Sequence, residues 1–245
     1  MSVSFFALHG FGGSPGELSF LLDRVSAAGF PVRAPTLPGH GTSPRDLQKC
    51  TFEDWVGHAR EELALARKEH ETVVVCGFSM GSLVALDLAS DESTRKDVSA
   101  LVVLGCALHL APGLRAAFRL AQAAKVRLPD VYLARPFGPD IRDKTLASSI
   151  GGYERHPVRA AMEVYRAGQS IRARLAQVTC PTLALHGEHD RVCSIKGAYE
   201  LVSLLGTRDV RVRTYARSAH MLALDHDREE VARDVIAFLE RHSRV

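Results

Sequence analysis

The chain has 245 residues, of which 46% are hydrophobic, so it can enclose the core of one sizeable domain. Its formal net charge of +3 is too small to indicate a nucleic-acid-binding protein. No segment approaches the roughly 20 consecutive apolar residues of a membrane-spanning helix, and the first ten residues lack the features of a signal peptide, so we expect a cytoplasmic monomer or homodimer without stable membrane insertion.

Six short segments rich in apolar residues are predicted to be strands. They span residues 3–8, 31–35, 72–77, 100–105, 181–187 and 209–215. Most of them are continuous apolar runs, which is typical of strands buried on both faces of a sheet.

Helix signals lie between these strands. The segment SPGEL at 14–18 offers Ser14 as an N-cap, a proline at the first helical position and Glu17 at the third. Thr51 and Asp54 have the spacing of a capping box, and Ser194 precedes another helical pattern. The alternation of strands and helices predicts an α/β fold with a mostly parallel, doubly wound sheet of about six strands.

Residues 107–178 separate the fourth and fifth predicted strands. A connection of this length is unusual unless it has structure of its own, and two of its segments, 114–126 and 156–171, have helical patterns. We therefore expect one domain, residues 1–245, with residues 107–178 inserted as a small, mostly helical cap.

The segment VVVCGFSMGSLVALDLA at 73–89 contains the pattern GxSxG between a predicted strand and a predicted helix. Such a turn strains the serine backbone, and its glycines remove Cβ atoms that would collide where strand and helix approach. Ser79 is therefore the candidate nucleophile, with the positive end of the following helix directed at its hydroxyl.

A serine hydroxyl needs a base to take its proton and an acid to orient that base. Asp190 follows the fifth predicted strand and His220 lies between the last strand and the last helix, so the order Ser79, Asp190, His220 suits this architecture. Asp225 and Asp227 are expected in the first turn of the last helix instead.

Other polar residues compete less well for the same roles. Asp209 opens a strand at its amino end, which is the wrong edge of the sheet. His186 and His189 share the loop of Asp190, and we expect them to be packing or solvent-facing groups.

The glycine-rich segment LHGFGGSP at 8–15 directly follows the first predicted strand. Its backbone amides are uncrowded, so Phe11 is the candidate for one amide of an oxyanion hole and Met80, after the nucleophile, for the other. The segment lacks the glycine patterns of nucleotide-binding loops. The five cysteines contain no CxxC pair, so we expect neither a disulfide framework nor a zinc site. Hydrolysis by an activated serine needs no metal and no organic cofactor, and we expect none.

These motifs make the chain resemble the α/β-hydrolase superfamily, and within it the small bacterial carboxylesterases and monoacylglycerol lipases. The resemblance covers nearly the whole length and includes the following segments. They are LHGFGGSP, APTLPGHG at 34–41, FEDW at 52–55, GFSMGS at 77–82, HGEHDRV at 186–192 and SAHMLALDHDREEVARDVIAFL at 218–239.

The resemblance implies Ser79 as nucleophile, Asp190 and His220 as its relay, and the amides of Phe11 and Met80 as the oxyanion hole. It also implies an architectural role for His40. The family usually has an antiparallel pair of strands before the HGF strand, whereas this chain begins almost directly on that strand.

The leading hypothesis is a serine carboxylesterase that hydrolyses short- to medium-chain esters, a small-molecule substrate, through an acyl-enzyme. A monoacylglycerol lipase or a carbon–carbon bond hydrolase would use the same residues, and a catalytically silent ligand-binding scaffold is a further alternative. The cap segment contributes the candidate substrate-binding residues. They are Leu108, Leu110, Leu114 and Phe118.

Overall fold

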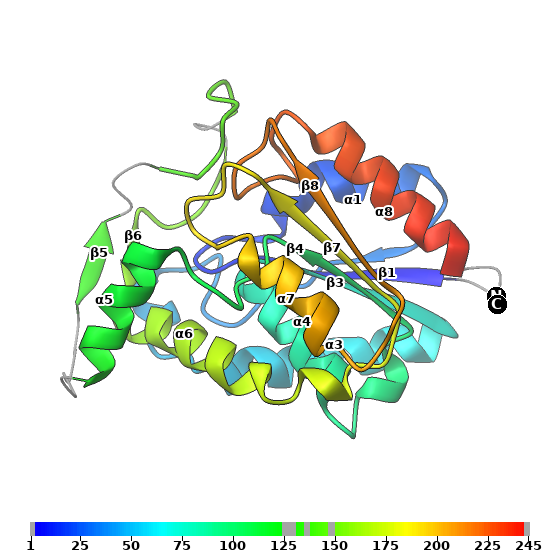
Figure 1. Cartoon of the computed structure of the whole chain (residues 1–245), viewed down its shortest axis with the longest axis horizontal. Coiled ribbons are helices and arrows are strands. Elements are labelled where there is room, and N and C mark those ends of the chain that lie inside the picture. The colour runs from blue at the N-terminus through cyan, green and yellow to red at the C-terminus, as the bar shows by residue number, and fades with distance from the viewer. Residues whose placement is uncertain (1–2, 124–130, 135–137, 147–149, 243–245) are drawn as a thin grey trace.

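The computed structural model describes residues 3–123, 131–134, 138–146 and 150–242. Six strands form one fully parallel sheet in the order β2-β1-β3-β4-β7-β8 (Figure 1). They are β1 (Val3–Leu8), β2 (Val32–Arg33), β3 (Thr72–Phe78), β4 (Ala100–Leu104), β7 (Thr182–Gly187) and β8 (Val210–Tyr215). The prediction of a six-stranded parallel sheet is confirmed.

Helices cover both faces of this sheet. In Figure 1 two of them, α1 (Ser19–Ala27) and α8 (Arg228–His242), lie together on one face. The other face is covered by α3 (Phe52–Glu69), α4 (Met80–Ser90), α6 (Val158–Arg172) and α7 (Lys196–Leu204). The described chain also contains the short helix α2 (Pro44–Leu47), the 3-10 turns η1 (Pro15–Leu18), η2 (Arg95–Asp97) and η3 (Leu175–Gln177), and one further helix in the connection between β4 and β7.

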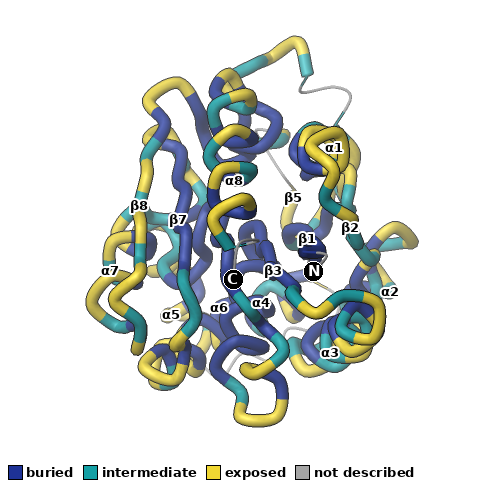
Figure 2. Tube along the Cα trace, turned by 90° about the vertical axis from the view of Figure 1, so that its right-hand side faces the viewer, coloured by how far each residue is buried: buried dark blue, intermediate teal, exposed yellow. Residues whose placement is uncertain are grey.

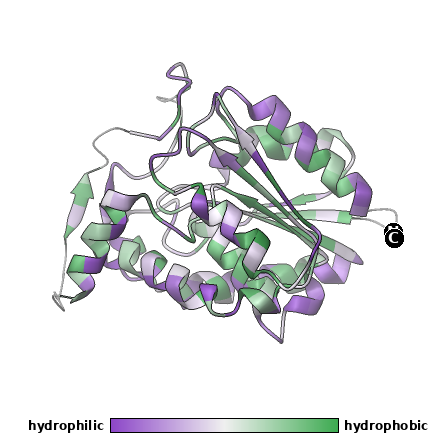
Figure 3. Cartoon of the chain, viewed as in Figure 1, coloured by the Kyte–Doolittle hydropathy of each residue, from purple (hydrophilic) through white to green (hydrophobic). Residues whose placement is uncertain are grey.

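The core consists of two apolar layers separated by the sheet. Successive residues of β1 alternate between the layers, with Phe5 packed toward α1 and α8 and Phe6 toward α3 and α4. Figure 2 shows the central strands buried and the outward faces of the helices exposed, and Figure 3 shows mostly hydrophobic residues along the same strands. The continuous apolar runs are explained by this burial on both faces.

The sheet edges differ from its centre. The edge strand β2 has only two residues, and β8 at the other edge carries Arg211 and Arg213 at exposed positions. Short length and positive charge both disfavour pairing with the edge of another sheet.

The chain between β4 and β7 contains α5 (Pro112–Ala123), α6, and a two-stranded antiparallel ribbon of β5 (Tyr132–Ala134) and β6 (Arg155–Pro157). The helix α6 matches the second predicted helical segment, and α5 matches the described part of the first, whose residues 124–126 lie outside the described residues together with 127–130, 135–137 and 147–149 of the predicted cap. The ribbon was not predicted. In Figure 1 α5 and the ribbon lie at one end of the molecule, beyond the end of the sheet at which β1 and β3 finish. Among the described residues, no helix combines the length and apolar character needed to cross a membrane.

The predicted capping box of α3 is confirmed, since Thr51 and Asp54 exchange side-chain to backbone hydrogen bonds. The predicted start of the first helical segment is also confirmed, since Ser14 is the N-cap of η1, accepts the Gly16 N–H and precedes Pro15 at the first position, with α1 following directly. Glu17, the third residue of η1, accepts the Gly10 N–H on its carboxylate at 2.9 Å. The start of this helical segment therefore helps to fix the glycine-rich loop after β1.

Candidate active site

Ser79 lies at a sharp turn between β3 and α4. Its φ of 53° and ψ of −117° make it the one non-glycine residue with positive φ in the described part of the chain. A Cβ atom at Gly77 would lie 2.2 Å from the carbonyl oxygen of Gly81, and one at Gly81 would lie 2.3 Å from that of Leu8. The two glycines therefore allow the close approach that holds the serine in a strained conformation.

The structure brings Ser79, His220 and Asp190 together at the carboxyl edge of the sheet. The Oγ of Ser79 lies 2.8 Å from Nε2 of His220, and Nδ1 of His220 lies 2.7 Å from Oδ2 of Asp190. An ionised Asp190 accepts the Nδ1 proton, so Nε2 is left to accept the proton of the serine hydroxyl. All three side chains are largely removed from solvent.

Burial and charge compete in setting the pKa values of this pair. Burial alone would raise the pKa of Asp190, but the neighbouring His220 and hydrogen bonds from His186 and His220 outweigh it and hold the pKa well below its usual range. Burial alone would lower the pKa of His220, but Asp190, with smaller effects of Asp140 and Glu17, raises it instead. Asp190 therefore stays ionised, and the imidazolium of His220 is stabilised when it forms.

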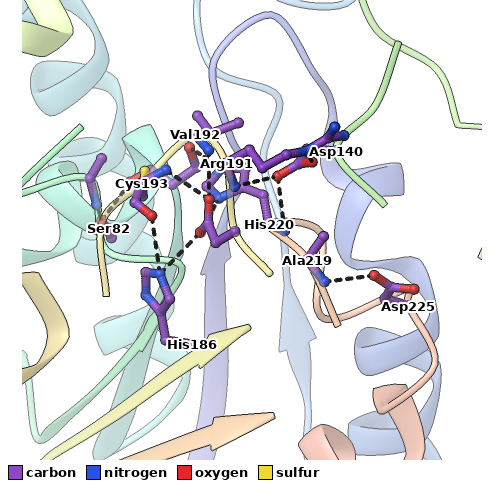
Figure 4. Close-up of polar contacts among 12 residues, drawn as sticks. Ser82, Asp140, His186, Arg191, Val192, Cys193, Ala219, His220 and Asp225 are labelled. Carbon is purple, nitrogen blue, oxygen red and sulfur yellow. Dashed lines mark hydrogen bonds and ion pairs between the residues drawn. The ribbon is translucent and has the colours of Figure 1, made fainter. Parts of the chain in front are cut away.

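Asp190 is held by more donors than His220 alone. Its Oδ1 accepts the backbone N–H groups of Val192 and Cys193 at 2.8 and 2.7 Å. Nε2 of His186 lies 3.2 Å from Oδ2 and 3.3 Å from the Cys193 carbonyl oxygen, as Figure 4 shows. His186, near the end of β7, is fully buried. The expectation that it is a packing or solvent-facing group missed this contact with the carboxylate, for which the signal was its position four residues before Asp190.

The loop after β1 lies against the serine with its backbone fixed from two sides. His9 donates from Nδ1 to the carbonyl of Gly10 and accepts the Leu37 N–H at Nε2. Burial lowers the pKa of His9 to about 3, so the ring is neutral and can make both bonds. His40 also supports this loop, because its ring packs against the rings of His9, Phe11 and Trp55.

The two amides predicted to form the oxyanion hole are not used in backbone hydrogen bonds of the described residues. Within the described ranges, neither the Phe11 N–H nor the Met80 N–H donates a hydrogen bond to another residue. Met80 begins α4, where the first amides of a helix have no partner inside the helix. Their donation to an anion beside Ser79 stays a prediction.

A cavity of about 470 Å³ opens over Ser79 and His220. Its wall is mostly apolar and includes three of the four predicted substrate-binding residues, Leu110, Leu114 and Phe118. Leu108 does not line it, and lies instead in the main core between the sheet and α6. The prediction that Leu108 binds substrate is therefore wrong, because the chain after β4 is still packed in the core at position 108.

Asp225 and Asp227 were expected in the first turn of the last helix, but they precede it. The buried Asp225 carboxylate accepts the backbone N–H groups of Arg142, Asp143 and Ala219, and Asp227 binds Arg217 and Ser218. These two acids order the loop that carries His220.

One group of potential metal ligands exists in the described part of the chain, formed by Asp190, Cys193 and His220, whose ligand atoms lie within 4.8 Å of one another. Burial raises the pKa of the Cys193 thiol well above its usual range, which keeps it protonated and a poor ligand. The other two residues are already hydrogen bonded to each other. This donor set suits proton transfer better than metal binding.

Known proteins similar to this chain over nearly its whole length are named as ester hydrolases. A thermostable monoacylglycerol lipase from Bacillus sp. (strain H-257) is 25% identical over 241 residues, which are 98% of this chain and 92% of that protein. A carboxylesterase from Bacillus subtilis (strain 168) is 22% identical over 238 residues, covering 96% of this chain and 91% of the relative. Among solved structures, one reported for the metagenome-derived lipolytic enzymes LipS and LipT has a TM-score of 0.87 at 24% identity, covering 98% of this chain and 94% of that one.

The family model described as serine aminopeptidase, S33, matches residues 3–227, a span that runs from β1 to the residue before α8. The resemblance drawn from the sequence motifs is confirmed by this match. The chain therefore belongs to the serine aminopeptidase, S33, family of α/β-hydrolases.

Proposed function

We propose that the protein is a serine carboxylesterase that hydrolyses short- to medium-chain carboxylic esters through an acyl-enzyme. The observation that carries this proposal is the continuous hydrogen-bonded chain from Ser79 Oγ through His220 to Asp190 at the floor of an apolar cavity. The relatives named as carboxylesterase and monoacylglycerol lipase support the choice of an ester as substrate.

In the proposed reaction Ser79 Oγ attacks the ester carbonyl carbon while His220 Nε2 takes the hydroxyl proton. The amides of Phe11 and Met80 stabilise the oxyanion of the tetrahedral intermediate. The bond to the leaving alcohol breaks as the His220 imidazolium returns its proton to that oxygen. Water then attacks the acyl-enzyme by the same route, the acid is released and the proton returns to Ser79.

The electrostatics of the site support these steps. Asp190 remains charged throughout and stabilises the imidazolium without being protonated itself. Ser79, at the start of α4, lies at the positive end of the helix dipole, which favours the negative charge of the intermediate.

We further propose that residues 107–178 act as a cap that selects the acyl group. Leu110, Leu114 and Phe118 come from the chain before and within α5, and Val158 and Val164 of α6 face the same cavity. Such a wall removes an alkyl chain from water at about 25 cal/mol per Å² of apolar surface. In this proposal the ester carbonyl lies beside the charged relay, and the acyl chain lies against the apolar wall.

A series of p-nitrophenyl esters from acetate to palmitate tests the reaction class and the size of the cavity together. The proposal expects turnover of the shorter esters, with kcat/KM passing through a maximum and then falling as the acyl chain outgrows the cavity. No ester turnover, combined with cleavage of a ring-fission dienone, would instead identify a carbon–carbon bond hydrolase. Binding of esters without turnover would identify a silent scaffold.

Monoacylglycerol lipase activity is the second candidate, because two of the relatives cited in support carry that name. Assaying monoacylglycerols against ethyl esters of the same acids distinguishes it. A strong preference for the glyceryl ester would favour the lipase, and equal rates would favour the general esterase.

A further inference from the structure

Asp140 is a buried carboxylate that the relay itself does not use. It belongs to the described segment 138–146, which lies between β5 and β6 in the chain, and its exposed fraction is 6%. A buried carboxylate is costly unless donors surround it. Its partners therefore indicate what it stabilises.

Those partners come from two different loops. On one side Oδ2 accepts the Arg191 N–H and Oδ1 accepts Arg191 Nε, both at 2.8 Å. On the other side Oδ2 lies 3.4 Å from the His220 N–H, and the backbone carbonyl of Asp140 accepts the Met221 N–H at 3.0 Å. Figure 4 shows Asp140 between Arg191 and His220.

These contacts fall directly beside the relay. Arg191 is the residue after Asp190, and His220 is the base. The two loops follow different strands, β7 and β8, so the parallel sheet fixes where the strands end but not how far the loops reach beyond them. Asp140 joins the loop of the acid to the loop of the base.

A second carboxylate makes the connection reciprocal. Asp225, from the loop of His220, accepts the N–H groups of Arg142 and Asp143 at 2.9 Å each and that of Ala219 at 2.8 Å. Segment 138–146 thus donates two backbone amides to the loop of the base and places its own carboxylate on that loop in return. This pairing holds the segment in one place, which lets Asp140 act as a fixed point for both loops.

We propose that Asp140 is a positioning residue of the ester hydrolysis, which fixes the loop of Asp190 relative to the loop of His220 and so keeps the imidazole in reach of Ser79. This proposal rests on the proposed function. Displacements of about 1 Å at a reacting group can cost on the order of 100-fold in rate, so the effect of losing this fixed point is expected in kcat.

Electrostatics adds a second signature. The charged groups that act on His220 are Asp190, Asp140 and Glu17, which all favour its protonated form. Removing the charge of Asp140 lowers the pKa of His220, and the base then remains neutral at lower pH. Asp140 contacts the backbone N–H of His220, whereas Asp190 contacts the ring itself. The effect of Asp140 on the pKa of the ring is therefore the smaller one, and we expect the acidic limb to move by about half a pH unit.

The experiment compares Asp140→Asn, Asp140→Glu and wild type by kcat, KM and pH profile on a short p-nitrophenyl ester. The matched control is Asp143→Asn, on the same segment, whose carboxylate binds Thr145 and Arg228 rather than the loops of the relay. Asp140→Asn is expected to lower kcat about 10- to 100-fold with little change in KM, and to move the acidic limb of the profile to lower pH. Asp140→Glu is expected to lower kcat but keep the limb in place, and the control is expected to match wild type.

Either of two kinetic results for Asp140→Asn would overturn the proposal. Wild-type kcat and pH profile in Asp140→Asn would show that the contacts do not position the relay. A change in KM alone would show that Asp140, which also lines the cavity, contacts the substrate instead. If Asp140→Asn fails to fold, the kcat of Asp140→Glu decides, and an unchanged value contradicts the proposal.

The failure of the proposed function can be distinguished from the failure of this inference. A wild-type protein without esterase activity refutes the former. An NMR titration of His220 in wild type and Asp140→Asn does not need turnover, and an unchanged titration would refute the inference even in an active enzyme.

Discussion

Nε2 of His186 lies 3.2 Å from Oδ2 of Asp190, the same carboxylate oxygen that contacts Nδ1 of His220. One buried carboxylate is thus shared by two histidines and two backbone amides. Each donor that a buried carboxylate lacks makes its charged form less stable. His186 therefore contributes to keeping Asp190 charged and in place.

Replacing His186 tests this contribution. His186→Leu removes the Nε2 N–H that lies beside the Asp190 carboxylate and the Cys193 carbonyl, and we expect kcat/KM to fall roughly tenfold. His186→Gln retains an N–H donor of similar reach and should recover most of the loss. Equal activity of the leucine and glutamine variants would show that the ring only fills space.

The pH dependence of activity follows from the raised pKa of His220. The base must be neutral to take the serine proton, so kcat/KM should increase with pH along a limb that lies above the ordinary imidazole value of about 6.5. Asp190→Asn should move this limb to lower pH and reduce kcat by about 1,000- to 10,000-fold. A limb that stays in place in this variant would contradict the assignment of Asp190.

The tight packing at the elbow predicts a large loss of stability on a small substitution. In Gly81→Ala the new Cβ would lie 2.3 Å from the carbonyl oxygen of Leu8, which is backbone and cannot move freely. We expect the free energy of unfolding to fall by about 2–4 kcal/mol, measured by denaturant unfolding.

Gly57→Ala provides the control for the elbow. Gly57 is inside α3, and a Cβ there meets nothing within 4 Å. That variant should be unchanged or more stable by about 0.5–1 kcal/mol. Similar destabilisation of both variants would show that steric overlap at the elbow is not the cause.

The cavity wall predicts a change in chain-length preference. Phe118 lines the cavity and stacks on Tyr165, with 5.5 Å between ring centroids. Phe118→Ala should widen the cavity and raise the ratio of decanoate to butyrate turnover. Leu120→Ala on the same helix changes a side chain that is 72% exposed and should leave that ratio unaltered. An unchanged ratio in Phe118→Ala would place the acyl chain elsewhere.

The sequence predicted the site to the extent that local patterns and strand order determine it. The elbow at Ser79 follows from a short motif between a strand and a helix, and the positions of Asp190 and His220 follow from the carboxyl ends of parallel strands, which lie along one edge of the sheet. The six strands of the sheet could be predicted because strands buried on both faces have continuous apolar runs.

The remaining features depend on contacts between distant segments. Asp140 is 80 residues from His220 in the chain, and no spacing rule connects them. The β5–β6 ribbon is short and partly exposed, so it lacks the apolar run that marks a buried strand. Leu108 is a leucine like Leu110 and Leu114, which line the cavity, and only the packing of the chain after β4 places it in the core.

Covalent labelling tests the central claim most directly. Wild-type protein treated with a fluorophosphonate should gain the mass of one phosphonyl group, and peptide mapping should locate it on Ser79, while Ser79→Ala gains none and His220→Ala is labelled far more slowly. Label on another residue, or label that persists in Ser79→Ala, would contradict the account.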